Sequence, residues 1–164
     1  MKILDVMKVM QDAYRQADQA FHKCDYQGSV DSYRKALKLC ESLPAEQEFD
    51  RGRFEASCYA GLSGALGRLE KHMESFAAAN MALAFYDQCG DKYLADTGRW
   101  LMAQVNQGAA LAALGCFPAA IEALQRAKQL FTDKALDPAK NAEWLKMVDG
   151  NIAAITAQME KKKQ

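Results

Sequence analysis

The side chains that most often carry catalysis or bind metals are sparse and scattered in this sequence. Its two histidines, His22 and His72, have no cysteine, histidine or carboxylate at the spacing of a metal-ligand pair. The five cysteines form no CxxC pair and their number is odd, which argues against a zinc site or a disulfide framework. We therefore expect neither a metal nor a cofactor.

Motifs for nucleophilic attack or phosphate binding are also missing. Gly61, Gly64 and Gly67 recur every third residue in a helical pattern, without the preceding strand or the following Lys-Ser/Thr of a phosphate loop. The stretch AGLSG lacks the GxSxG spacing of a nucleophile elbow. These absences predict that the protein is not an enzyme. An enzyme would be favoured instead if the fold brought Asp18, His22 and Arg68 together in a closed apolar pocket.

The charge balance excludes several classes of partner. The 164 residues contain 21 Lys plus Arg and 21 Asp plus Glu, so no net charge attracts nucleic acid or an anionic membrane. The lysines at 161–163 are expected to lie in a disordered tail, 161–164. No segment approaches the roughly 18 apolar residues of a membrane-spanning helix. We expect a cytoplasmic protein with reduced cysteines.

Three segments of the chain superimpose without gaps. They begin at Gln16, Leu62 and Gln107, so the offsets are 46 and 45 residues. Three of the superposed columns contain only small residues, whereas the columns between them are bulkier. The small columns are Ala17, Ser63 and Gly108; Ser29, Ser75 and Ala120; and Ala36, Ala82 and Ala127. Small residues allow two helices to approach closely, so each segment is predicted to be an antiparallel helix hairpin that stacks on the next.

These columns resemble the tetratricopeptide repeat. The likeness includes an aromatic column (Tyr26, His72, Phe117) and a turn glycine, Gly115, which Cys24 and Glu70 replace in the first two segments. It implies an all-α fold: a tetratricopeptide-like, right-handed superhelix of three long hairpins with a C-terminal capping helix, about seven helices in all. The common repeat has about 34 residues, and we expect the extra length here to extend the helices rather than the loops.

The chain is predicted to form a single domain, 1–160, in which helix breakers and caps mark the boundaries of the helices. Pro44 is predicted to open the third helix, Asp91 to cap the fifth, Pro118 to begin the sixth, and Asp137-Pro138 to begin the seventh. The hairpins are then about 4–43, 44–90 and 91–136. The last helix, about 138–160, has apolar residues at helical spacing but does not match the repeat, so it is predicted to cover the end of the last hairpin.

The resemblance also implies a binding surface. In the tetratricopeptide family the first helices of the hairpins line a concave groove, and transfer by register predicts that the groove contains Tyr14, Asp18, Phe21, Ser57, Gly64, Arg68, Met102, Val105 and Ala109. The family's carboxylate clamp uses Lys, Arg and Asn at positions that here hold residues such as Tyr14, Ala60 and Val105. A clamp of that kind is not expected.

The stretch from Pro44 to Leu69 further resembles a small bacterial family of tetratricopeptide-like proteins whose function is uncharacterised. The leading hypothesis is a non-catalytic interaction module, an adaptor or scaffold that binds a protein or peptide, or a second copy of itself as a homodimer. The alternatives are a secretion-type chaperone and a regulator that senses a peptide or small molecule in the groove.

Overall fold

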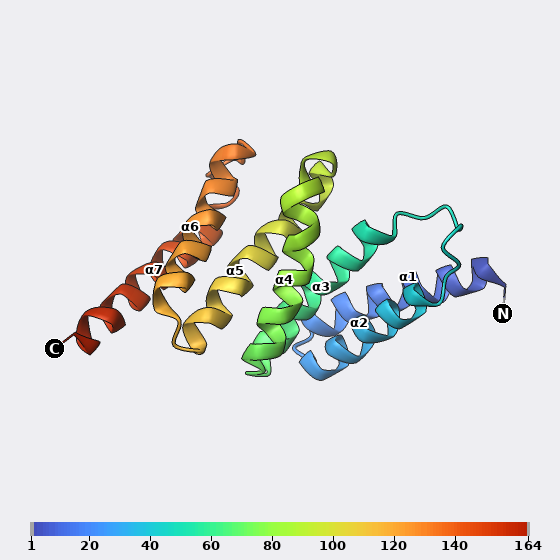
Figure 1. Ribbon diagram of the computed structural model, residues 1–164, viewed down its shortest axis with the longest axis horizontal. Helices are drawn as coiled ribbons and strands as arrows, with labels where there is room; N and C mark the ends of the chain where they lie inside the picture. Colours follow the sequence, from blue (N-terminus) through green and yellow to red (C-terminus); the bar gives the residue numbers. More distant parts are fainter. Residues whose placement is uncertain (1, 164) are drawn as a thin grey trace.

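The computed structural model describes residues 2–163, and this part of the chain is helical without a strand (Figure 1). Two short 3-10 turns, Gly90–Lys92 and Leu94–Asp96, precede the fifth α-helix. The α-helices are α1 (Ile3–His22), α2 (Tyr26–Glu41), α3 (Arg51–Arg68), α4 (His72–Cys89), α5 (Thr97–Ala113), α6 (Phe117–Asp133) and α7 (Ala142–Lys162). The prediction of an all-α fold with about seven helices is confirmed.

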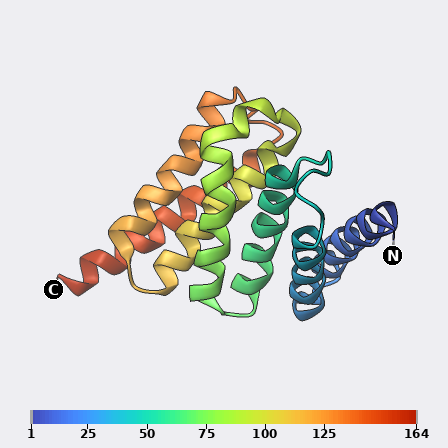
Figure 2. The ribbon, with the colours of Figure 1, turned by 45° about the vertical axis from the view of Figure 1, so that its right-hand side comes forward.

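The helices form three hairpins that follow one another along the molecule (Figures 1 and 2). Within them α1 packs on α2, α3 on α4 and α5 on α6, and each second helix packs on the first helix of the next hairpin. The three columns of small residues lie at these contacts, because every residue in them is buried. The aromatic column supplies the first residue of each second helix: Tyr26, His72 and Phe117.

The turn inside each hairpin has the same backbone conformation. Cys24, Glu70 and Gly115, which the repeat alignment places in one column, have φ angles of 61°, 60° and 82°. Glycine adopts this left-handed region at little cost, whereas other residues lose roughly 1–2 kcal/mol there. The turn is thus fixed by the packing of the hairpins, and it tolerates a cysteine or a glutamate where the third hairpin has glycine.

The connections between hairpins differ from the prediction. Pro44 does not open a helix: the chain runs through turns from residue 42 to residue 50, and α3 begins at Arg51 after Asp50. The Asp50 carboxylate accepts a hydrogen bond from the Arg53 amide at 3.2 Å and so caps the helix. A capping aspartate after the proline thus sets the start of this helix, and part of the extra repeat length lies in the connection.

The fifth and seventh helices also begin later than predicted. Asp91 lies in a 3-10 turn and pairs with Lys134, while α5 starts at Thr97. The Asp137 carboxylate accepts a hydrogen bond from the Ala139 amide, which forms a local turn, and α7 starts only at Ala142. At its other end α7 continues through Lys162, so residues 161 and 162 are helical; Gln164, in the predicted tail, lies outside the described residues. Pro118 lies in the first turn of α6, as predicted.

The helix starts are regularly spaced along the chain. Helices α3, α5 and α7 begin at residues 51, 97 and 142, so α7 takes the place that a fourth hairpin would give its first helix. Side chains of neighbouring repeats meet 43 residues apart in the sequence, as in Tyr14 with Ser57 at 2.6 Å and Ser63 with Asn106 at 3.0 Å. The four helices α1, α3, α5 and α7 share one side of the molecule, which we call the A-helix face.

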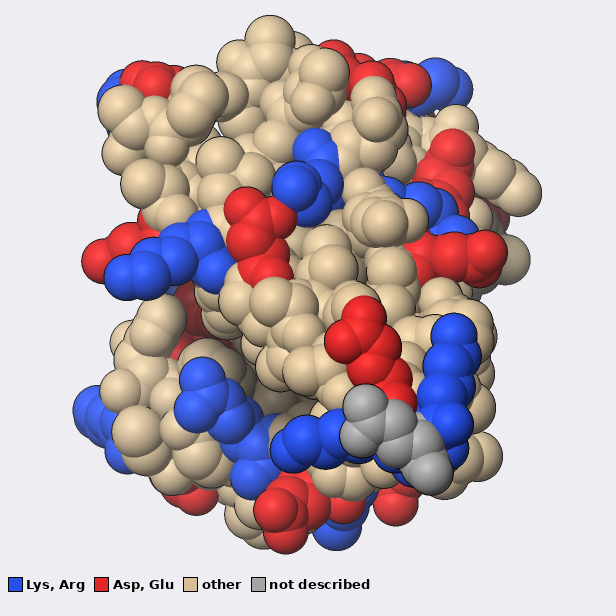
Figure 3. Space-filling view, turned by 90° about the vertical axis from the view of Figure 1, so that its left-hand side faces the viewer, with Lys and Arg blue, Asp and Glu red and all other residues tan. Residues whose placement is uncertain are grey.

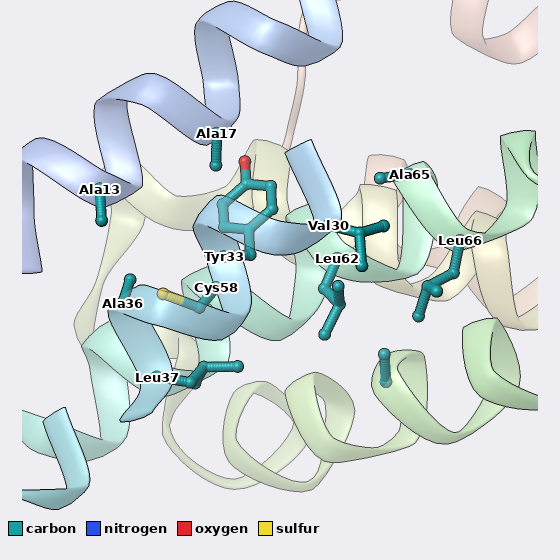
Figure 4. Packing of buried hydrophobic residues seen from close by; sticks show 11 residues of the cluster. Ala13, Ala17, Val30, Tyr33, Ala36, Leu37, Cys58, Leu62, Ala65 and Leu66 are labelled. Atoms are coloured by element: carbon teal, nitrogen blue, oxygen red, sulfur yellow. The ribbon is translucent and has the colours of Figure 1, made fainter. Parts of the chain in front are cut away.

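The core of the first two hairpins contains small residues and one large ring. Ala13 and Ala17 of α1 face Tyr33 and Ala36 of α2, with Cys58 of α3 behind them (Figure 4). Tyr33 is 1% exposed, and its hydroxyl points toward α1. The ring therefore reaches the A-helix face from a helix on the other side of the hairpin.

Candidate functional site

The A-helix face contains two pockets of similar size. The first, which we call the N-terminal pocket, has a volume of about 430 Å³ and lies between α1, α3 and the segments that precede α3 and α5. It is lined by Gln11, Tyr14, Arg15, Phe49, Asp50, Arg53, Phe54, Ser57 and Asp96. The second, the C-terminal pocket, has a volume of about 390 Å³ and is lined by residues of α1, α3, α5 and α7.

Polar side chains in the N-terminal pocket are bonded to one another. The Tyr14 and Ser57 hydroxyls share a hydrogen bond of 2.6 Å. Arg53 donates two hydrogen bonds to the Asp96 carboxylate, at 2.8 and 3.1 Å, which is the bidentate geometry that makes such pairs strong and directional. The pocket therefore holds Arg53 and Asp96 in a fixed pair.

A bridge of three polar side chains separates the two pockets. Arg99 of α5 donates one hydrogen bond to the Asp18 carboxylate on α1 at 2.9 Å and another to the Tyr33 hydroxyl at 3.1 Å. Its guanidinium also lies 5.2 Å from the centre of the Tyr14 ring. The Arg99 side chain is 17% exposed and that of Asp18 is 44% exposed. We call Arg99, Asp18 and Tyr33 the Arg99 bridge.

The bridge depends on a glycine in α3. A Cβ atom at Gly61 would lie 2.3 Å from the Tyr33 hydroxyl oxygen and 2.7 Å from Nη1 of Arg99. Such distances are far inside van der Waals contact. Only a residue without a side chain therefore leaves room at position 61 for Arg99 and Tyr33 to meet beside α3.

Burial changes the acid–base properties of the bridge. It raises the pKa of Tyr33 to about 12, although the positive charge of Arg99 lowers it in part. Burial alone would lower the pKa of Arg99. Its interactions with Tyr33, Tyr14 and Asp18 raise this pKa by more than burial lowers it, so the guanidinium remains charged. At neutral pH the bridge is therefore a cation bonded to a carboxylate and a neutral phenol.

The C-terminal pocket is mainly apolar. Its full lining is Phe21, Gly64, Arg68, Met102, Val105, Asn106, Ala109, Glu143, Trp144, Met147 and Asn151. Asn106 donates a hydrogen bond to the Ser63 hydroxyl at 3.0 Å, which fixes its amide at the floor. The charged residues Arg68 and Glu143 are both exposed.

The predicted groove residues fall into three places. Phe21, Gly64, Arg68, Met102, Val105 and Ala109 all line the C-terminal pocket. Tyr14 and Ser57 line the N-terminal pocket, and Asp18 belongs to the Arg99 bridge. Register along the repeats thus places all nine on the A-helix face, but in two pockets and the bridge between them rather than in one continuous groove.

Sequence reasoning missed the contributions of Arg99, Asn106 and α7. The prediction treated α7 only as a cap, although Trp144, Met147 and Asn151 line the C-terminal pocket. The repeat offset could have indicated this, because a helix that begins 45 residues after α5 occupies the next place on the A-helix face. Arg99 had no such signal, since its partners Asp18 and Tyr33 lie far from it in the sequence.

The histidines, cysteines and acidic residues are possible metal ligands and nucleophiles. No group of three or more His, Cys, Asp or Glu side chains within residues 2–163 could hold a metal ion. All five cysteines are free thiols; Cys40 and Cys58 are buried, and burial raises the pKa of both. Asp18 and Arg68 do not meet in one pocket: Asp18 bonds to Arg99, whereas Arg68 lies over the Tyr26 ring and lines the C-terminal pocket.

A further observation concerns membranes: within residues 2–163 the structure has no helix with the length and apolar character needed to cross one.

The fold is shared with solved structures of tetratricopeptide-like proteins. A TPR-like protein from Chlorobium tepidum is 22% identical, with a TM-score of 0.87 over 95% of this chain and 99% of that one. The TPR2B domain of yeast Sti1, solved in complex with pHsp70, is 18% identical, with a TM-score of 0.67 over 92% of this chain and 98% of that one. At these identities the likeness establishes the tetratricopeptide-like fold and no more.

Among curated proteins the search finds no match. A family model, in contrast, matches residues 4–142, which include the three hairpins except Ile3, and the first residue of α7. Because this match covers most of the chain, the protein belongs to the family described as Domain of Unknown Function (DUF3856).

Proposed function

We propose that the chain is a non-catalytic interaction module that binds a segment of another protein on its A-helix face. The observation that carries the proposal is the C-terminal pocket, where six of the nine predicted groove residues form one mainly apolar hollow. Pockets lined by apolar groups with a few placed polar ones are the usual form of binding sites. An adaptor or scaffold in the cytoplasm is the role that we propose for such a module.

The tetratricopeptide-like relatives support a protein or peptide as the ligand. The yeast Sti1 domain of the same fold was solved in complex with pHsp70. Here the positions of the family's carboxylate clamp hold Tyr14, Asp18, Ala60, Gly64, Val105 and Ala109, and Asp18 is already paired with Arg99. We therefore propose a different mode, in which apolar contacts supply most of the affinity.

The test is a selection of peptides from a phage-displayed random library against the 164-residue protein. Enriched peptides are synthesised, and their contact surface is mapped by backbone chemical-shift changes. We expect the changes to concentrate on α1, α3, α5 and α7. Peptides that shift mainly the exposed residues of α2, α4 and α6, or a selection that enriches none, would refute the proposal.

Two methionines provide a matched pair of variants for this test. Met147 lies in the C-terminal pocket and is 43% exposed, whereas Met81 on α4 is 54% exposed and lines neither pocket. Because both are exposed, Met147→Glu and Met81→Glu should fold equally well. Binding should be weakened at least tenfold by the first and unchanged by the second.

A further inference from the structure

The C-terminal pocket is completed by a helix that lies almost wholly outside the matched family region. The family model ends at Ala142, the first residue of α7. Trp144, Met147 and Asn151 project from the helix that follows and form one wall of the pocket. The ligand-facing surface therefore differs from that of the three hairpins alone.

This wall faces apolar side chains from two other helices, α1 and α5. Phe21 of α1, together with Met102 and Val105 of α5, lines the same hollow as Trp144 and Met147. Met147 is 43% exposed, so its side chain would lose accessible surface when a ligand fills the pocket. The volume of about 390 Å³ suits one large apolar side chain together with the backbone that carries it.

Two opposite charges stand on the rim of the pocket. Arg68 comes from the end of α3 and Glu143 from the start of α7, and both are exposed. In residues 2–163 no ion pair engages either of them, in contrast to the bonded pairs of the N-terminal pocket. The Arg68 guanidinium lies over the Tyr26 ring, 5.8 Å from its centre, in a cation–π contact.

The C-terminal end of the molecule carries charged and uncharged side chains. Figure 3 views that end and shows Lys, Arg, Asp and Glu side chains spread over it, with uncharged side chains between them and a hollow on one side.

We infer that the C-terminal pocket binds a peptide segment of a partner protein that carries one large apolar side chain, with an acidic residue on one side of it and a basic residue on the other. The apolar side chain enters between α5 and α7, the acidic residue meets Arg68, and the basic residue meets Glu143. The inference rests on the proposed function and assigns to α7 the selection of the ligand.

The experiment uses fluorescein-labelled peptides of about nine residues and measures binding by anisotropy. The reference peptide has a central tryptophan, two glutamates on one side and two lysines on the other. Companion peptides replace the tryptophan by serine, or have only glutamates or only lysines as flanks. The proteins are the full chain and its Met147→Glu, Met81→Glu, Arg68→Glu and Glu143→Lys variants.

We expect the reference peptide to bind the wild-type chain and the Met81→Glu variant equally. Replacing the tryptophan by serine, or Met147 by glutamate, should weaken binding at least tenfold. The rim charges should change selectivity rather than abolish binding. Arg68→Glu should prefer the all-lysine flanks, and Glu143→Lys the all-glutamate flanks, by about threefold to fivefold.

Several results would overturn the inference. One is a reference peptide that does not bind the wild-type chain at about 1 mM, or that binds Met147→Glu equally well. Another is a self-associating chain whose dimer Met147→Glu dissociates, because a second copy would then fill the pocket. If the phage-selected peptides bind the A-helix face at Tyr14 and Ser57 instead, the inference fails while the proposed function stands.

Discussion

The two pockets of the A-helix face have similar volumes but differ in how their charged side chains are paired. In the N-terminal pocket Arg53 is bonded to Asp96 and Tyr14 to Ser57, so the polar groups are already satisfied within the chain. In the C-terminal pocket the rim charges Arg68 and Glu143 have no such pairing in residues 2–163, and the walls are mainly apolar.

We infer from this difference that the paired groups of the N-terminal pocket contribute mainly to stability, and we propose the C-terminal pocket as the one that admits a ligand. Breaking a bonded pair to admit a ligand costs its hydrogen bonds, and the ligand must replace them before it gains affinity. An open apolar wall has no such cost, because covering it only removes apolar surface from water. Changes on the N-terminal side of the face should therefore act mainly on folding, and changes on the C-terminal side mainly on binding.

Gly61→Ala is expected to have the largest effect on stability. The new methyl group would overlap the Tyr33 ring and the Arg99 guanidinium, and Tyr33 is too deeply buried to move aside freely. Overpacking of this kind costs about 2 to 3 kcal/mol in free energy of unfolding. Urea denaturation measures the change.

Gly98→Ala is the control for this substitution. It also places a methyl group on a helix of the A-helix face, but no atom lies within 4 Å of the new position. It should stabilise the chain by about 0.5 to 1 kcal/mol through helix propensity alone. Equal effects of the two substitutions would show that the crossing at Gly61 is not tightly packed.

Alkaline pH should weaken the N-terminal side through Tyr33. The pKa of Tyr33 is about 12 in the folded chain and 10.0 in its ordinary state, so the folded state holds the phenol proton more tightly. Its stabilising contribution is complete below pH 10 and is lost between pH 10 and pH 12. The loss should reach about 2 kcal/mol over that range.

The measurement compares urea midpoints of the wild type and Tyr33→Phe at pH 9 and pH 11.5. The phenylalanine variant has no proton to lose at this position, so its stability should fall less between the two pH values. Burial also raises the pKa of Tyr14 and Tyr86, which leaves a residual fall in the variant. Identical falls in both proteins would contradict the assignment to Tyr33.

The repeat pattern predicted most of this architecture because it reports packing between neighbours. Columns such as Ala36, Ala82 and Ala127 are small because helices approach there, and all three are fully buried. The helix starts were less accessible to prediction. Pro44 favours a helix start, but Asp50 caps the helix that forms, and only the packing of the whole connection decides between them.

The site was predicted in part for the same reason. Register places Phe21, Gly64 and Val105 on one face, and the structure brings them into one pocket. It could not reveal the Arg99 bridge, because the Asp18–Arg99 pair joins the first hairpin to the third across Gly61. A contact between positions so far apart leaves no periodic signal in a single sequence.

Arg99→Met tests the bridge with a smaller expected effect. The variant keeps much of the buried length of the side chain but loses the hydrogen bonds to Asp18 and Tyr33. Asp18 is 44% exposed, so water replaces part of the loss, and the cost should be about 1 to 2 kcal/mol. A double-mutant cycle with Asp18→Asn should show coupling between the two positions.

Arg68→Met is its counterpart at the C-terminal pocket. This exposed arginine contacts the Tyr26 ring, so its replacement should change the free energy of unfolding by less than about 0.5 kcal/mol. The comparison between the two pockets would lose its basis if Arg68→Met destabilised the chain as much as Arg99→Met.

Gly150→Ala is expected to have an effect that is local to α7. Gly150 lies in the middle of this exposed helix, and a Cβ atom there would meet no atom within 4 Å. Alanine should therefore stabilise the helix by about 1 kcal/mol. Val148 and Ile155 are the buried residues of α7, so the helix is held by few side chains and should open more readily than the hairpins.

Hydrogen exchange separates this local effect from a global one. If α7 opens alone, Gly150→Ala should slow the exchange of its amides about fivefold while the amides of α3 and α4 exchange as before. Slower exchange throughout the chain would instead mean that α7 unfolds together with the hairpins. In that case the wall formed by Trp144 and Met147 would be as rigid as the Arg99 bridge, and rigidity would no longer distinguish the two pockets.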